Sequence, residues 1–194
     1  MIDPFDCTDF ERTDAELEEF LLFCVAVAGK TALQIADALK RFLNKVEGST
    51  PFDRIRKMIQ TDTLLANIIG SKIGKHKLLT KAFGQIVEAG LDLRTCLPAD
   101  LEQIHGISFK TSRYFIVHSR STTNLAAIDT HMLKYLGSLG YKVPKTTPSN
   151  AKQYERLERI VITLARQNQM TLADFDLSVW KTYARPKEVK CAST

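Results

Sequence analysis

Closely spaced cysteines are missing from this sequence. Its 194 residues include four cysteines, at positions 7, 24, 96 and 191. No two of them have the spacing of a zinc or iron–sulfur site, so we expect no metal centre built from side chains. Cys24 lies on an apolar helix face and is expected to be a core thiol.

Strand patterns and long apolar runs are also missing. No segment of useful length alternates between apolar and polar residues, and there is no repeat or low-complexity segment. The apolar run from Phe20 to Ala28 is too short to span a bilayer. No secretory peptide is recognisable, because acidic residues precede any apolar run. We therefore expect an all-α protein that is intracellular, cytoplasmic or nucleoid-associated, with reduced thiols and no membrane partner.

The composition is that of an ordinary globular protein, with 44% hydrophobic and 25% charged residues. Its net charge of +5 and pI near 9.0 modestly favour a polyanionic partner. The most basic segment lies near residues 70–81, where Lys75 and Lys77 are our candidates for a phosphate contact. A solvated, lysine-rich helix face explains the same residues equally well.

The pattern that is present is helical. Thr13 and Glu16 match a capping box, and Thr50 and Pro51 match an N-cap followed by the first helical position. Apolar residues recur every three or four positions after these signals. The expected helices cover residues 13–29, 31–46, 52–60, 62–89 with a break near 70–74, 149–168 and 171–185, and the tail after Pro186 is expected to be frayed.

Residues 98–120 match two short helices joined by a tight turn. The turn contains His105, Gly106, Ile107 and Ser108, and Gly106 can adopt the positive φ that the reversal needs. Such a turn leaves backbone N–H groups unpaired at the start of the next helix, where the helix dipole favours an anion. Lys110 and Arg113 follow on that helix and suit a DNA backbone phosphate, without selecting a base sequence.

A further helix begins after Asp129, which lies 129 − 110 = 19 residues beyond Lys110. An aspartate in this position is usually an N-cap, and that role is compatible with a chemical one. By itself, Lys110 would more often be a phosphate-binding or solvated lysine. His131 is a candidate to bind phosphate or orient the site, although a packed histidine is more common. Tyr114 and Phe115 suit the core better than base stacking.

These residues resemble the helix-hairpin-helix superfamily of DNA glycosylases (HhH-GPD), and in particular lyase-type 8-oxoguanine glycosylases without an iron–sulfur cluster. The resemblance rests on Ile104, Gly106, Ile107, Lys110 and the Ala-Ile-Asp-Thr-His run at 127–131. Ser108 departs from the family pattern, because a second glycine is usual there. The resemblance implies an all-α fold with two helical subdomains flanking a cleft for DNA and a flipped base, within one domain over residues 1–194. The N-terminal helices at 13–60 and the C-terminal helices at 149–184 are expected to pack together.

The resemblance also implies a mechanism. Lys110 would be the nucleophile that forms a Schiff base with the sugar, and Asp129 the carboxylate that activates it and stabilises the sugar cation. The base must be flipped out of the stack into a pocket, for which Trp180, Phe175 and Asp176 are candidates. Trp180 is about as well explained as a core residue. No cofactor is expected except a monovalent cation that backbone carbonyls of the hairpin would hold.

The resulting hypothesis is a monomeric DNA glycosylase and lyase that acts on double-stranded DNA containing a damaged base, such as the oxidised purine 8-oxoguanine. Two alternatives remain open. One is a phage-type transferase that modifies thymine bases instead of excising them and needs no Schiff base. The other is a module that uses the hairpin only to bind DNA.

Overall fold

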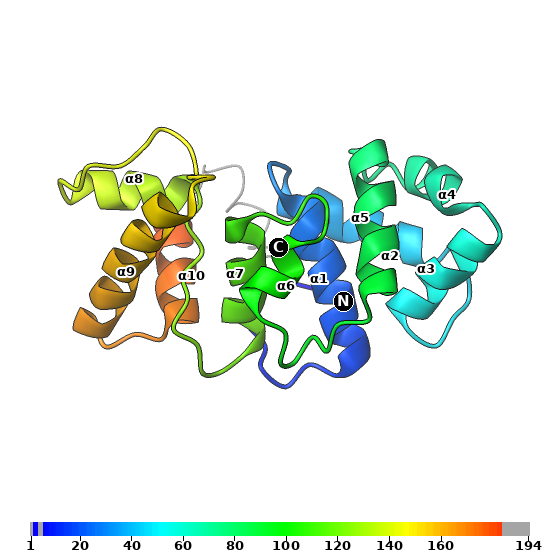
Figure 1. Cartoon of the computed structure of the whole chain (residues 1–194), viewed down its shortest axis with the longest axis horizontal. Coiled ribbons are helices and arrows are strands. Elements are labelled where there is room, and N and C mark those ends of the chain that lie inside the picture. Colours follow the sequence, from blue (N-terminus) through cyan, green and yellow to red (C-terminus); the bar gives the residue numbers. More distant parts are fainter. Residues whose placement is uncertain (1, 4–5, 184–194) are drawn as a thin grey trace, which may run out of the picture. The chain divides into compact units, whose positions relative to one another are not determined.

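The computed structural model describes residues 2–3 and 6–183, and these contain ten helices and no strand. The predicted all-α class is therefore confirmed. The chain divides into two compact units, Met1–Ile107 and Ser108–Thr194 (Figure 1). The first unit contains α1 (Asp14–Val27), α2 (Ala32–Leu43), α3 (Pro51–Gln60), α4 (Leu64–Gly70), α5 (His76–Ala89) and α6 (Pro98–Glu102). The second contains α7 (Phe109–Ser119), α8 (Thr130–Ser138), α9 (Ala151–Gln167) and α10 (Leu172–Tyr183).

Local capping places the helix starts close to where the sequence predicts them. The capping box of α1 is present: Glu16 accepts the Thr13 N–H at 2.8 Å, and the Glu16 N–H donates to the Thr13 hydroxyl at 3.4 Å. At the start of α3, the Thr50 hydroxyl accepts the Asp53 N–H at 3.2 Å. Each contact satisfies a backbone N–H that has no partner within its helix.

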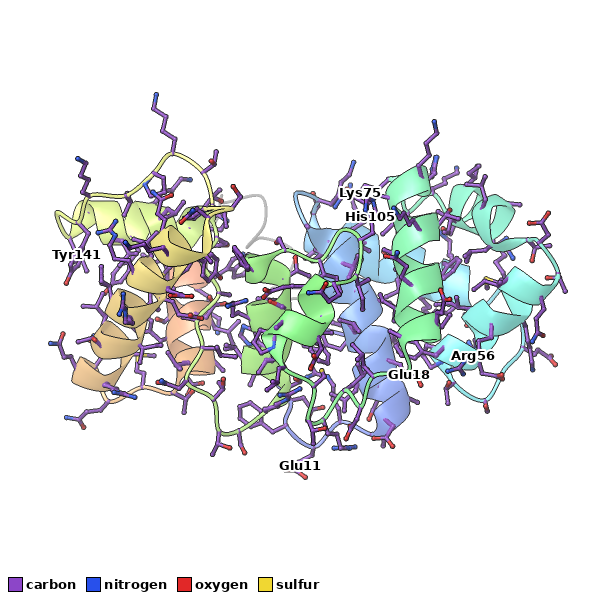
Figure 2. The ribbon with its side chains drawn as sticks, in the orientation of Figure 1. Glu11, Glu18, Arg56, Lys75, His105 and Tyr141 are labelled. Carbon is purple, nitrogen blue, oxygen red and sulfur yellow. The ribbon has the colours of Figure 1, made fainter. Side chains whose placement is uncertain are left out.

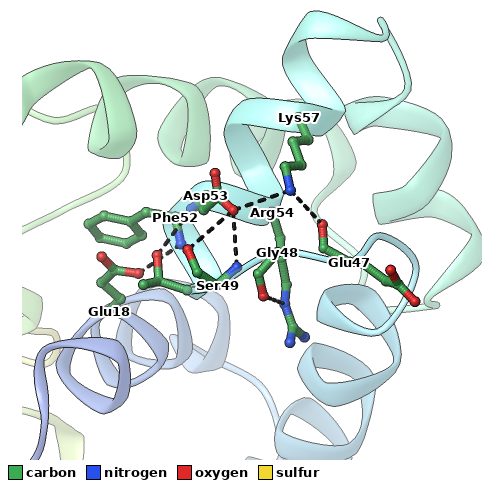
Figure 3. Close-up of polar contacts among 9 residues, drawn as sticks. Glu18, Glu47, Gly48, Ser49, Phe52, Asp53, Arg54 and Lys57 are labelled. Atoms are coloured by element: carbon green, nitrogen blue, oxygen red, sulfur yellow. Dashed lines mark hydrogen bonds and ion pairs between the residues drawn. The ribbon is translucent and has the colours of Figure 1, made fainter.

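A neighbouring helix also contributes to the start of α3. The carboxylate of Glu18, on α1, accepts the Phe52 N–H at 2.8 Å (Figure 3). Asp53 accepts the Ser49 N–H at 3.0 Å and pairs with Lys57 at 3.4 Å. The Glu18 side chain of α1 thus binds a backbone N–H at the N-terminus of α3. This hydrogen bond joins the two helices in addition to their apolar packing.

The core of the first unit is built around α1, which packs against α2, α3 and α5. The sequence pattern predicts one buried face, but all seven residues from Phe20 to Ala26 are at most 1% exposed. A helix that is apolar on all sides is enclosed on all sides. Cys24 is 1% exposed, which confirms it as a core thiol.

The second unit is organised around α10, which packs against α7, α8 and α9 and lies between α7 and α9 (Figure 1). Its core includes Tyr154 and Leu157 of α9, Met132 and Leu136 of α8, and Phe175 of α10. Because α10 contacts the other three helices of this unit, a polar side chain on it can reach α7 and the start of α8.

The sequence-based boundaries need small corrections. The helix expected over 31–46 ends at Leu43, because the Lys45 N–H bonds to the Phe42 carbonyl three residues back and the i→i−4 pattern does not continue. The break near 70–74 is confirmed, with positive φ at Lys72, Gly74 and Lys75. The expected fraying after Pro186 lies outside the described residues. The packing of residues 13–60 against 149–184, the single domain and the cleft stay predictions.

No helix in the described part of the chain combines the length and the apolar character needed to cross a membrane.

Candidate active site

The amine of Lys110 lies over an aromatic ring of its own helix. Lys110 is in the first turn of α7, with Tyr114 and His118 one and two turns further along the same face. The Lys110 Nζ is 4.2 Å from the centroid of the Tyr114 ring, and the Tyr114 and His118 ring centroids are 4.6 Å apart. We call these three residues the α7 row. Lys110 is half-buried.

Asp176 extends the α7 row from a second helix. His118 is fully buried, and its Nε2 lies 3.1 Å from Oδ2 of Asp176 on α10. Because a carboxylate only accepts hydrogen bonds, Nε2 is the donor. Asp176 was predicted as a base-pocket residue. The structure ties it to His118, through a contact that the sequence pattern does not reveal.

Asp129 precedes α8 and caps it. Its backbone is extended, and its Oδ1 accepts the Met132 N–H at 2.8 Å. The expectation of an N-cap is thus confirmed. The cap fixes the carboxylate at a helix N-terminus, where the dipole favours negative charge.

The segment leading to Asp129 is fixed by a buried tyrosine. The Tyr154 hydroxyl accepts the Ile128 N–H at 2.9 Å and donates to the Ala126 carbonyl at 3.1 Å. Tyr154 is 1% exposed. These two hydrogen bonds hold an extended segment in place without a strand, so α9 positions the carboxylate on α8.

The electrostatic environment links the two carboxylates and the lysine. Burial raises the pKa of Asp129 above its ordinary value, and the nearby Asp176 carboxylate raises it further. The Met132 N–H, Lys110 and His131 act in the opposite direction on the pKa of Asp129 but do not outweigh these effects. A carboxylate with raised proton affinity within the electrostatic influence of an amine is suited to accept a proton from that amine.

Arg113 was predicted to contact DNA phosphate, but it points into the second unit. Its Nε lies 3.3 Å from Oε1 of Glu158, and the two side chains are 12% and 9% exposed. The guanidinium also lies 5.1 Å from the centre of the Tyr154 ring. Glu158 accepts the Ala126 N–H at 3.0 Å as well. This placement gives Arg113 a packing role, and its phosphate contact stays a prediction.

The hairpin turn requires glycine at position 106. Gly106 has φ of +85°, and a Cβ there would lie 3.0 Å from Cδ2 of Leu78 on α5. The residues on either side of Gly106 are held through their backbone N–H groups: the His105 N–H donates to the Gln85 side chain at 2.7 Å, and the Ile107 N–H donates to the Ile104 carbonyl at 3.1 Å.

Ser108 occupies the position where the family pattern has a second glycine. Its φ is −98°, which any residue adopts, so the backbone does not need glycine there. Its hydroxyl lies 3.3 Å from that of Thr111. The side chains of the turn, from His105 to Ser108, include no carboxylate, so a cation there would depend on backbone carbonyls. That cation stays a prediction.

The two lysines predicted to bind phosphate differ in the structure. The Lys75 amine donates to the carbonyls of Ala26 and Ala28, at the C-terminal end of α1. Figure 2 labels Lys75. The amine therefore satisfies carbonyls that the helix leaves without a partner. Lys77 is exposed in the first turn of α5. Of the two, Lys77 is better placed to meet a phosphate.

The other candidate residues lie on α8 and α10. His131 is half-buried and its Nδ1 donates to the Tyr183 carbonyl at 3.1 Å. Phe175 is 3% exposed, with its ring 5.7 Å from that of Tyr135 in the core, which favours packing over the predicted base contact. Trp180 is half-buried.

The second unit thus brings Lys110, Asp129 and Asp176 into one electrostatic cluster, together with His131. Sequence analysis missed His118 as a member of this site. Its position eight residues after Lys110, and therefore on the same helix face, is the signal that was available. The cluster joins an amine, a carboxylate that caps a helix and a second carboxylate, which are groups suited to nucleophilic and proton-transfer chemistry.

The sequence model of the Ogg-HhH family, described as 8-oxoguanine DNA glycosylase, matches residues 1–170 of the chain. The match includes the hairpin turn, Lys110 and Asp129, and it ends within the segment before α10. No solved structure matches the chain.

Proposed function

Because the chain belongs to the Ogg-HhH family of 8-oxoguanine DNA glycosylases, we propose that it excises an oxidised purine such as 8-oxoguanine from double-stranded DNA and cleaves the strand through a Schiff base on Lys110. The observation that supports the lyase step is the cluster in the second unit. The charge of Lys110 lowers the pKa of the half-buried Asp129 carboxyl, against the larger effects of desolvation and Asp176 that raise it.

In the first step, the bond from C1′ of the sugar to the base nitrogen breaks, and the base leaves with its electrons. Positive charge develops on the sugar, and the Asp129 carboxylate stabilises it. The neutral amine of Lys110 forms a bond to C1′. The attached nitrogen then loses one proton to the Asp129 carboxylate, whose proton affinity is raised by burial, and Asp129 returns this proton to O4′ when the sugar ring opens.

In the second step, the sugar ring opens at its C1′–O4′ bond and a Schiff base forms between C1′ and Nζ of Lys110. The iminium makes the C2′ proton acidic. Loss of that proton drives β-elimination of the 3′ phosphate, which cleaves the strand. Water then releases the lysine from the sugar remnant.

DNA is held mainly by its backbone in this proposal. The N–H groups at the start of α7, which have no partner within the helix, bind a phosphate next to the turn, and the exposed Lys77 adds a cation. The target base is flipped out of the stack, because its glycosidic bond is not accessible within the duplex. The protein acts as a monomer.

The experiment is borohydride trapping with two duplexes, one containing 8-oxoguanine and one containing an abasic site, alongside an undamaged duplex. Borohydride reduces a Schiff base to a stable amine, so a covalent protein–DNA adduct reports the intermediate. The variants are Lys110→Gln and Asp129→Asn. Lys134→Gln, at an exposed lysine of α8, is the matched control.

We expect adducts with both damaged duplexes for the wild type and Lys134→Gln, none for Lys110→Gln, and at least tenfold fewer for Asp129→Asn. Binding of the wild type to DNA with neither an adduct nor strand cleavage would contradict the lyase proposal. In that case base modification or simple DNA binding is the better explanation.

A further inference from the structure

A nucleophilic lysine has to present its nitrogen at one point, although its side chain has four rotatable bonds. The entropic cost of holding such a side chain is among the largest for any residue. Within residues 2–3 and 6–183, the Lys110 amine forms no ion pair that would fix it. The contact that does restrain it is the face of the Tyr114 ring, 4.2 Å from Nζ to the ring centroid.

The Tyr114 ring is itself supported from behind. His118 packs against it with ring centroids 4.6 Å apart and planes inclined by 58°. His118 is 0% exposed and is hydrogen-bonded at 3.1 Å to Asp176, which belongs to a different helix. A buried, hydrogen-bonded pair that joins α7 to α10 resists displacement, because moving either partner leaves a buried polar group unsatisfied.

From these contacts we propose that Tyr114 is a positioning residue for the Lys110 amine, and that the His118–Asp176 pair keeps the Tyr114 ring in place. The inference rests on the proposed Schiff-base function of Lys110. The ring attracts the protonated lysine before DNA binds. After the proton has left, the same ring limits the rotamers that the neutral amine can adopt.

This role uses the aromatic face of Tyr114 and not its hydroxyl. Phenylalanine should therefore replace it, whereas leucine should not, because leucine has no π face and leaves the lysine free to sample other rotamers. A residue that only filled space would lose unfolding free energy in Tyr114→Leu but would leave the trapping rate of the folded protein unchanged.

The test is single-turnover borohydride trapping by the full chain on a duplex with one abasic site. Abasic DNA carries no target base, so a lost contact with a flipped base cannot explain a slower reaction. The variants are Tyr114→Phe, Tyr114→Leu and His118→Gln. Tyr141→Leu makes the same Tyr-to-Leu change at an exposed tyrosine in the segment after α8 and serves as the matched control (Figure 2).

At saturating DNA we expect Tyr114→Phe and Tyr141→Leu to trap within about twofold of the wild-type rate, and Tyr114→Leu about tenfold more slowly. Affinity for a duplex with a stable abasic analogue should not change. His118→Gln keeps a donor for Asp176 but removes the ring behind Tyr114, and we expect trapping about threefold slower.

A Tyr114→Leu rate equal to that of the wild type would overturn the inference, and so would a Tyr114→Phe rate as slow as that of Tyr114→Leu. If circular dichroism shows that Tyr114→Leu does not fold, a wild-type rate for His118→Gln overturns it instead. Absence of any adduct with the wild type refutes the proposed function, and the inference with it. Normal wild-type trapping with unaffected variants refutes the inference alone.

Discussion

Asp129 has two roles that can be separated by one pair of substitutions. Its carboxylate caps α8 through the Met132 N–H, at 2.8 Å, and it carries a negative charge that burial and Asp176 make unfavourable. Asp129→Asn keeps a cap and removes the charge. Asp129→Ala removes both. Any difference in stability between the two variants therefore measures the cap, and the difference between Asp129→Asn and the wild type measures the charge.

The expected magnitudes follow from the geometry. Asparagine and aspartate are about equal as N-caps, whereas alanine in place of either costs about 1 kcal/mol. We therefore expect Asp129→Ala to be about 1 kcal/mol less stable than Asp129→Asn. At neutral pH, Asp129→Asn should be at least as stable as the wild type, because it does not bury an ionised group beside the Asp176 carboxylate.

The pH dependence has a definite sign. The pKa of Asp129 is raised in the folded protein, so the folded state binds this proton more tightly than the unfolded state does. The resulting stabilisation is complete below the ordinary pKa of 3.8 and is lost as the pH rises through the higher folded value. The stability of the wild type relative to Asp129→Asn should therefore fall as the pH rises above about 4.

Urea unfolding followed by tryptophan fluorescence measures these differences. Trp180 is the only tryptophan, and it lies on α10 in the same unit as Asp129. Asn150 provides the matched control, because it caps α9 by accepting the Gln153 N–H at 3.1 Å and is exposed. Asn150→Ala should cost about 1 kcal/mol, and Asn150→Asp should be nearly neutral wherever the new, exposed carboxyl is ionised.

The reasoning is refuted if Asp129→Asn is destabilised at neutral pH as much as Asp129→Ala. That result would mean that the ionised carboxylate stabilises the fold, which is incompatible with a raised pKa.

Three further predictions concern the scaffold and the DNA contacts. Tyr154→Phe removes the two buried hydrogen bonds that hold the segment before α8. It should lower the free energy of unfolding in urea by about 1–3 kcal/mol and also slow borohydride trapping. An unchanged trapping rate would show that this segment does not position the site. Gly106→Ala should be more destabilising than Gly90→Ala. Both glycines have positive φ, but of the two only Gly106 has a neighbouring side chain within 4 Å of the added Cβ. Equal losses in unfolding free energy would contradict this. Lys77→Ala should reduce the slope of log affinity for DNA against log salt concentration by about one unit, whereas Lys75→Ala should mainly lower the free energy of unfolding. Salt titrations of both variants check this, and a reduced slope for Lys75→Ala but not for Lys77→Ala would contradict it.

The sequence by itself was sufficient for most helix starts and for the candidate pair Lys110 and Asp129. Helix starts depend on contacts between residues three positions apart, such as Thr13 with Glu16 and Asp129 with Met132. Such contacts are formed within one turn and so can be inferred from the residue types in order. The same holds for Gly106, whose positive φ is a property of the local turn.

Tertiary structure decided which way the polar side chains point. Arg113 meets Glu158 across 45 residues of chain, and His118 meets Asp176 across 58. Lys75 reaches the end of α1 across 47 residues. The sequence predicted a DNA contact for Arg113 and Lys75 and a pocket position for Asp176. It could not predict the partners found in the structure, because these depend on how the helices pack and not on spacing along the chain. The same packing partly buried Asp129 and brought it under the electrostatic influence of the Asp176 carboxylate. Its raised proton affinity, on which the proposed chemistry depends, is therefore a consequence of the fold and not of the local sequence.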